Sequence, residues 1–157
     1  MMSNRFAGME RAEVYTQGSY FDTGEYKAVI KDVLMKDTRN SGPAVIVEFE
    51  VVESSNANAP AGCKRSWVQT LKSKDVAWPN LLAFLAVLFG VDSSNAAQVQ
   101  WINTQLAPNS ARFMEELVDR KTVNGQPVVG KVIRVSAFPH TTKQNKTITR
   151  VRFFPGT

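Results

Sequence analysis

The sequence predicts a mainly β fold of the α+β class, with five strands and one helical segment between the third and fourth strands. Three observations predict it: stretches that alternate apolar with polar residues, a central stretch with helical periodicity, and turn-forming residues between them. A length of 157 residues with 43% apolar residues suits one domain with a sizeable core. We expect a single domain over residues 1–157, with a helical insertion at about 74–119.

The first two strands are predicted before residue 55. Residues 24–36 alternate apolar with polar side chains and slip phase near Val33, which is typical of a long strand with a bulge. The loop at 37–43 is rich in Asn, Ser, Gly and Pro and ends this strand. The second strand shows the clearest alternation, with one face formed by Val45, Val47, Phe49 and Val51. Glu48 and Glu50 then face the other way.

The third strand is predicted at 63–71, before the helical segment. It places three side chains on one face: Arg65, Trp67 and Gln69. From about 74 to 119 the apolar residues recur with helical period. The first helix is apolar almost all round, so we expect it to be buried and to end at Gly90. Ser93 or Ser94 can cap a second helix, and turn residues after it introduce a third.

The last part of the chain predicts two hairpins. Asn124 and Gly125 form a strong two-residue hairpin signal. The fourth strand is expected at about 128–138 and the fifth at about 146–154, with a polar and basic loop between them at 139–145.

This order of elements is that of a five-stranded OB-type Greek-key barrel. An RNA-recognition fold would need a helix after the first strand, and a doubly wound sheet would need alternating helices. A family resemblance rests on three stretches and on the terminal hairpin. The stretches are Gly-Glu-Tyr-Lys-Ala-Val-Ile at 24–30, Gly-Pro-Ala-Val-Ile-Val-Glu-Phe-Glu-Val-Val at 42–52, and Gly62 leading to Trp67. In these the chain resembles the OB-fold single-stranded DNA-binding proteins of bacteriophages.

The resemblance implies a protein that coats and protects single-stranded DNA during DNA replication or recombination in the host cytoplasm. It implies replication or recombination proteins as partners and permits a homo-oligomer. Many such proteins end in an acidic tail that recruits partners, whereas this sequence ends in Arg-Phe-Phe-Pro-Gly-Thr. Either the partner-recruiting function of such a tail is absent here, or the tail has been trimmed from the chain.

Basic residues are concentrated toward the C-terminus. The formal net charge is +5, but residues 1–60 carry −3 and residues 61–157 carry +8, while residues 121–157 contain seven Lys or Arg and no Asp or Glu. The strand pattern places Arg134 opposite or diagonal to Arg152 on one outer face. Because like charges so placed cost stability, a polyanion such as a nucleic acid explains them better than a merely solvated face does.

Aromatic side chains supply the second requirement of a single-strand site, because every base has a π-face. Trp67 is the favoured stacking residue, with packing beneath the helical segment as the alternative, and Tyr26 fits stacking and core packing equally. Glu48 and Glu50 would repel phosphate, so the strand should avoid them. Sequence preference should be weak, since no element resembles a groove reader. The expected DNA-binding residues are Trp67, Arg65, Tyr26, Lys27, Arg134, Phe138, Lys143, Lys146, Arg150 and Arg152.

Catalysis is a competing class, which we rank lower. The carboxylate pairs that could act as acid and base are Glu48 with Glu50 and Glu115 with Asp119. The four-residue spacing of Arg112, Glu116 and Arg120 instead predicts an exposed helix with ion pairs. Cys63 and His140 lie in no recognised catalytic motif. We therefore expect no enzyme, no cofactor and no metal.

Composition and sequence pattern argue against several other classes of protein. One cysteine and one histidine cannot build a disulfide scaffold or a zinc cage. The longest apolar run, 81–91, is shorter than a membrane span, and the N-terminus has no apolar signal, so we expect a cytoplasmic protein. The main alternative is an OB-fold interaction or assembly module of a virion or replisome, with the helical segment as its partner surface and no nucleic-acid binding.

Overall fold

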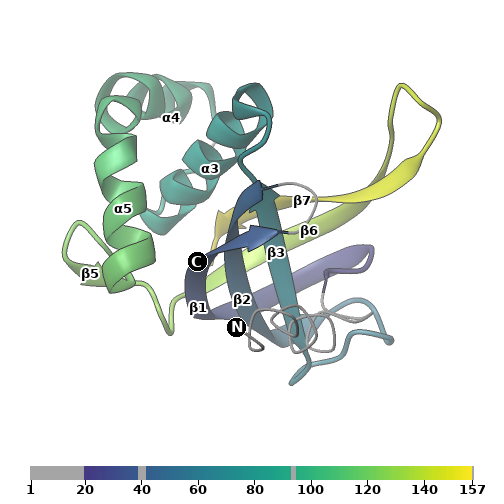
Figure 1. Ribbon diagram of the computed structural model, residues 1–157. Coiled ribbons are helices and arrows are strands. Elements are labelled where there is room, and N and C mark those ends of the chain that lie inside the picture. The colour runs from purple at the N-terminus through teal and green to yellow at the C-terminus, as the bar shows by residue number, and fades with distance from the viewer. Residues whose placement is uncertain (1–19, 39–41, 93–94, 157) are drawn as a thin grey trace, which may run out of the picture.

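The computed structural model of the chain describes residues 20–38, 42–92 and 95–156. Its centre is a five-stranded antiparallel sheet with the order β3-β2-β1-β6-β7 (Figure 1). The α-helices of the described residues gather at one end of the sheet, at the upper left of Figure 1. The structure therefore confirms a mainly β fold with a helical segment after the third strand.

The central strand of the sheet is β1, which pairs with β2 on one side and β6 on the other. The strands of the sheet are β1 (Gly24–Thr38), β2 (Gly42–Ser54), β3 (Lys64–Thr70), β6 (Val132–Thr141) and β7 (Thr147–Pro155). Register shifts interrupt the β1–β2 ladder between Lys27 and Ala28 and between Ile30 and Asp32. The predicted bulge is therefore present, slightly before Val33.

The most deeply buried strand is β2. The predicted inner face is confirmed, because its four side chains are all buried: Val45, Val47, Phe49 and Val51. Ala44 and Ile46 on the opposite face are buried as well, whereas Glu48 and Glu50 are partly exposed. The inner face packs into one core cluster with residues of the helical segment such as Phe84.

The helical segment is broken into several short elements. They are α3 (Lys74–Leu88), α4 (Ala96–Trp101), the π-helix η1 (Ile102–Leu106), the 3₁₀-helix η2 (Ala107–Asn109) and α5 (Ser110–Arg120). The predicted burial of α3 is confirmed, since Phe84 and Leu85 are fully buried. The α3 helix ends as expected, with Gly90 directly after the C-cap at a φ of 77°.

The N-cap of α4 is Asn95, whose side-chain oxygen accepts hydrogen bonds from the backbone N–H groups of Ala97 and Gln98. The expected caps, Ser93 and Ser94, lie outside the described residues.

The hairpin predicted at Asn124-Gly125 is present and is held by α5. It consists of β4 (Thr122–Val123) and β5 (Gln126–Pro127). Both turn residues have a positive φ, as a type I′ turn requires. The Glu116 carboxylate accepts hydrogen bonds from the Gly125 N–H at 2.7 Å and the Thr122 hydroxyl at 2.8 Å. The other carboxylate oxygen accepts a hydrogen bond from the Asn124 N–H at 3.2 Å, so Glu116 holds the turn with both oxygens, while the charge of Arg120 on the same helix also lowers its pKa.

The strand β6 begins at Val132 and not at about residue 128. Residues 128–131 form a turn in which the Lys131 N–H donates to the Val128 carbonyl at 3.0 Å and Gly130 has a φ of 94°. In the described part of the chain β3 and β7 are the two sheet edges and do not pair with each other. The backbone pairing of the described strands thus does not show the predicted closure into a barrel.

Candidate nucleic-acid interface

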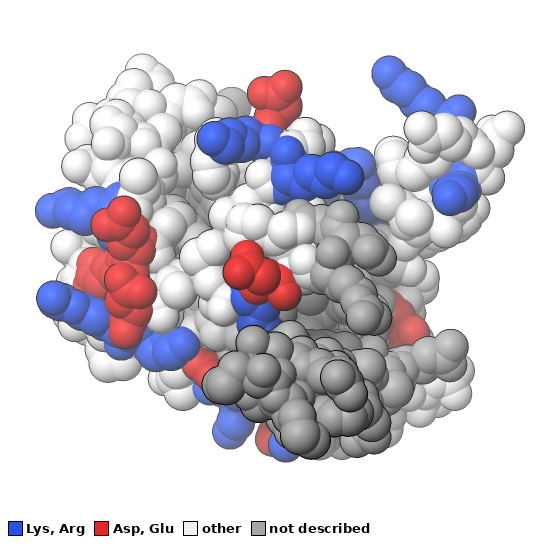
Figure 2. Space-filling view, in the orientation of Figure 1, with Lys and Arg blue, Asp and Glu red and all other residues white. Residues whose placement is uncertain are grey.

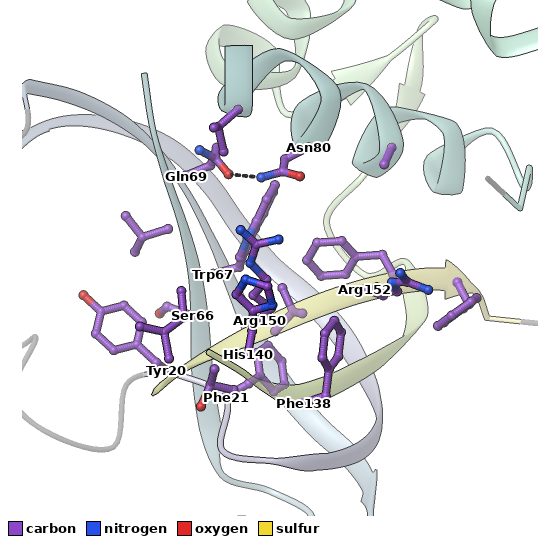
Figure 3. Close-up of a pocket in the computed structure, with 18 residues that line it drawn as sticks. Tyr20, Phe21, Ser66, Trp67, Gln69, Asn80, Phe138, His140, Arg150 and Arg152 are labelled. Atoms are coloured by element: carbon purple, nitrogen blue, oxygen red, sulfur yellow. Dashed lines mark hydrogen bonds between the residues drawn. The ribbon is translucent and has the colours of Figure 1, made fainter. Parts of the chain in front are cut away.

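A groove of about 940 Å³ lies between the two edge strands β3 and β7, with α3 at one end (Figure 3). Aromatic side chains from β3, β6, β7 and the segment before β1 line it, among them Trp67, Phe138 and Tyr20. The strand β7 adds Arg150 and Arg152, which are both exposed. None of the described residues that line the groove is acidic. The groove therefore combines π-faces with uncompensated positive charge.

The outer face of the β6–β7 hairpin alternates arginine with phenylalanine across the strands. The cross-strand pairs on this face are Arg134 with Phe154, Ser136 with Arg152, and Phe138 with Arg150. Arg134 is thus diagonal to Arg152, as predicted. Each of these guanidinium groups lies over a ring, Arg134 over Phe154 and Arg152 over Phe138, both at 5.6 Å from the ring centroid. These cation–π contacts orient the guanidinium groups while leaving their charge exposed.

Trp67 is both a core residue and part of the groove. Its ring lies 5.3 Å from that of Phe84 on α3 and 4.8 Å from that of Phe153 on β7. The face of β3 that carries Trp67 therefore points inward, as the packing alternative expects. Trp67 nevertheless remains partly exposed and lines the groove.

Arg65 points inward with Trp67 and does not line the groove. Only 10% of its side chain is exposed, and its guanidinium pairs with Asp22 at 3.4 Å. It also donates to the Lys64 carbonyl at 2.9 Å, as Gln69 does to the Thr70 carbonyl. In the structure Arg65 is thus held by Asp22 and by a backbone carbonyl of β3, and whether it contacts phosphate stays a prediction.

Tyr26 is a core residue. It is 4% exposed, packs on the ring of Phe21 at 5.0 Å, and donates its hydroxyl to the Asp22 carbonyl at 2.7 Å. Burial raises the pKa of its phenol above the ordinary value of 10.0. Of the two roles expected for Tyr26, the structure shows core packing, because its ring presents no face to the groove.

The three expected lysines lie outside the groove. Lys27 on β1 pairs with Glu53 at 3.2 Å. Lys143 and Lys146 are exposed in the β6–β7 turn, at the tip of the projecting hairpin. Figure 2 shows this hairpin tip as a separate lobe with basic residues on it.

The groove also contains residues that the sequence patterns did not indicate. Tyr20 forms a parallel β-bridge with Ser66 of β3, which brings its ring to one end of the groove. At the other end the Asn80 amide on α3 donates to the Gln69 amide oxygen at 2.9 Å (Figure 3). His140 lies on the outer face of β6. Of these residues, only His140 could have been predicted from the sequence, because it continues the outward-facing alternation of Arg134, Ser136 and Phe138.

Comparison with known proteins adds no relative: no protein-family model matches the chain, and no curated protein matches it. Within the residues that the structure describes, no three His, Cys, Asp or Glu side chains are grouped so that they could hold a metal ion. A search of the same residues finds no helix with the length and apolar character of a membrane span.

Proposed function

We propose that this chain is an OB-type single-stranded DNA-binding protein that coats and protects DNA during replication or recombination. The observation that carries the proposal is the groove between β3 and β7, which is lined by aromatic rings and arginines. None of its described lining residues is acidic. The sheet order supports it, because an OB barrel also places its first strand between the second and fourth strands of the barrel.

Two interactions would hold the strand. Arg150 and Arg152 neutralise backbone phosphates, which makes binding salt-dependent. Exposed faces of Tyr20, Phe138 and Trp67 stack on bases, and each stacked base contributes about 1–3 kcal/mol without reading its identity. Since these contacts are to π-faces and phosphates, we expect weak sequence preference.

The test is a fluorescence titration in which Trp67 is the only tryptophan. Trp78 and Trp101 do not line the groove, so the variant Trp78→Phe/Trp101→Phe leaves a reporter inside it. Adding oligo-dT should quench Trp67 emission, and affinity should fall as salt is raised. Duplex DNA should quench weakly, because its bases are not available for stacking.

Three results would contradict the proposal. If oligo-dT causes neither quenching nor a gel shift at low salt, the alternative is favoured, an assembly module that does not bind nucleic acid. Equal affinity for duplex and single strands would exclude stacking as the basis of binding. Cleavage of the oligonucleotide upon addition of magnesium would indicate a nuclease.

A further inference from the structure

A second groove lies on the other side of α3, between α3, α5 and one end of the β1–β2 hairpin. Its volume is about 820 Å³. Apart from Asn103, Ser110, Glu115 and Asp119, every residue that lines it is apolar. We call it the helical groove. It shares no lining residue with the groove between β3 and β7, so α3 is a wall between two separate surfaces.

Large apolar side chains of the helical groove remain exposed to solvent. Trp78 on α3 is 49% exposed and Met35 on β1 is 43% exposed. Exposed apolar patches with a polar border mark interaction sites, and tryptophan is among the residues that dominate binding energy there. The groove is therefore suited to bulky apolar side chains of a binding partner.

The charge at the helical groove is negative. Its two charged lining residues, Glu115 and Asp119, lie four residues apart on α5, where like charges repel. No Lys or Arg is among the described residues that line the groove. A cationic group on a ligand would relieve this repulsion, whereas a phosphate would increase it.

We propose that the helical groove binds an amphipathic helical segment of a partner protein that carries bulky apolar side chains flanked by Lys or Arg. The apolar lining receives the apolar stripe of that helix, as in helix-in-groove recognition, and Glu115 and Asp119 select its charge. The site does not depend on the proposed DNA-binding function, and it can be occupied while DNA fills the other groove.

The test uses three fluorescein-labelled helical peptides of about 15 residues. The first has a leucine stripe flanked by lysines, the second replaces the lysines with glutamates, and the third replaces the leucines with serines. In fluorescence anisotropy titrations the first should bind at least about tenfold more tightly than the other two. Glu115→Gln/Asp119→Asn should remove the preference for lysine, while the matched control Glu48→Gln/Glu50→Gln should keep it.

Equal binding of the lysine and glutamate peptides would overturn the proposal, as would an unchanged preference in Glu115→Gln/Asp119→Asn. A second copy of this chain is the competing occupant. Light scattering that shows a dimer which Met35→Glu dissociates would assign the groove to that copy and overturn the proposal.

Discussion

The two grooves on either side of α3 have opposite charge and different walls. The groove between β3 and β7 carries Arg150 and Arg152 and no described acidic residue, whereas the helical groove carries Glu115 and Asp119 in an apolar lining. A net charge of +5 describes neither surface. A single helix thus separates a groove lined by arginines from a groove lined by carboxylates.

Phe153→Ala should have the largest effect, because Phe153 joins the wall of the first groove to the core. Its ring lies 4.8 Å from that of Trp67 and 5.2 Å from that of Phe84, and it is 8% exposed. We expect the free energy of unfolding in urea to fall by about 3–5 kcal/mol. Phe154→Ala, at the more exposed neighbouring position, is the control and should cost less than half as much. Equal losses would show that the two faces of β7 are not distinct.

Arg150→Ala/Arg152→Ala tests the charge of the first groove directly. Removing two phosphate contacts should lower the slope of log affinity against log salt by about one to two units in oligo-dT titrations. The control Arg112→Ala/Arg120→Ala removes the same charge from α5 and should leave the slope nearly unchanged. If both double variants lower the slope equally, net charge and not the groove governs binding.

Tyr26→Phe tests whether Tyr26 acts only as a core residue and not as part of the groove. Losing the hydroxyl donated to the Asp22 carbonyl should reduce the free energy of unfolding by about 0.5–1.5 kcal/mol. Affinity for oligo-dT should not change, because the ring is buried. A drop in affinity for oligo-dT with an unchanged free energy of unfolding would show that Tyr26 contributes to DNA binding after all.

Glu116→Gln should have the smallest effect, seen as a change in pH dependence. Hydrogen bonds from Gly125 and Thr122 lower the pKa of the Glu116 carboxyl below its usual 4.5. A carboxyl whose folded-state pKa is lowered stabilises the fold above its unfolded-state pKa, and this is lost as pH falls through the folded-state pKa. The variant should therefore lose less stability than the wild type between pH 6 and pH 3.

Identical profiles for wild type and Glu116→Gln would show that the charge of Glu116 contributes nothing to holding the turn.

The strand pattern could be predicted because alternation is a local property. Residues from Val47 to Val51 alternate in the sequence and in the structure, and the face shared by Ile133 and Val135 is buried. The direction of the face with Trp67 could not be predicted, because it depends on register. Trp67 stands opposite the buried Val47, and residues opposite each other in a ladder share a face.

The helical groove could not be predicted for a similar reason. Helical periodicity indicates that Leu81 and Leu85 are apolar and buried, but not which side of α3 faces which neighbour. That depends on how α5 returns toward the β1–β2 hairpin through η1 and η2. Met35 and Trp78, far apart in the sequence, meet at one surface only through this path.

The central position of β1 in the sheet has a consequence for co-translational folding. One neighbour, β2, follows β1 immediately, but the other, β6, is made only after the whole helical segment. Closing such a long loop is slow compared with forming a hairpin. The β1–β2–β3 meander therefore forms with one edge of β1 unpaired, and the groove between β3 and β7 cannot form until β7 has been synthesised.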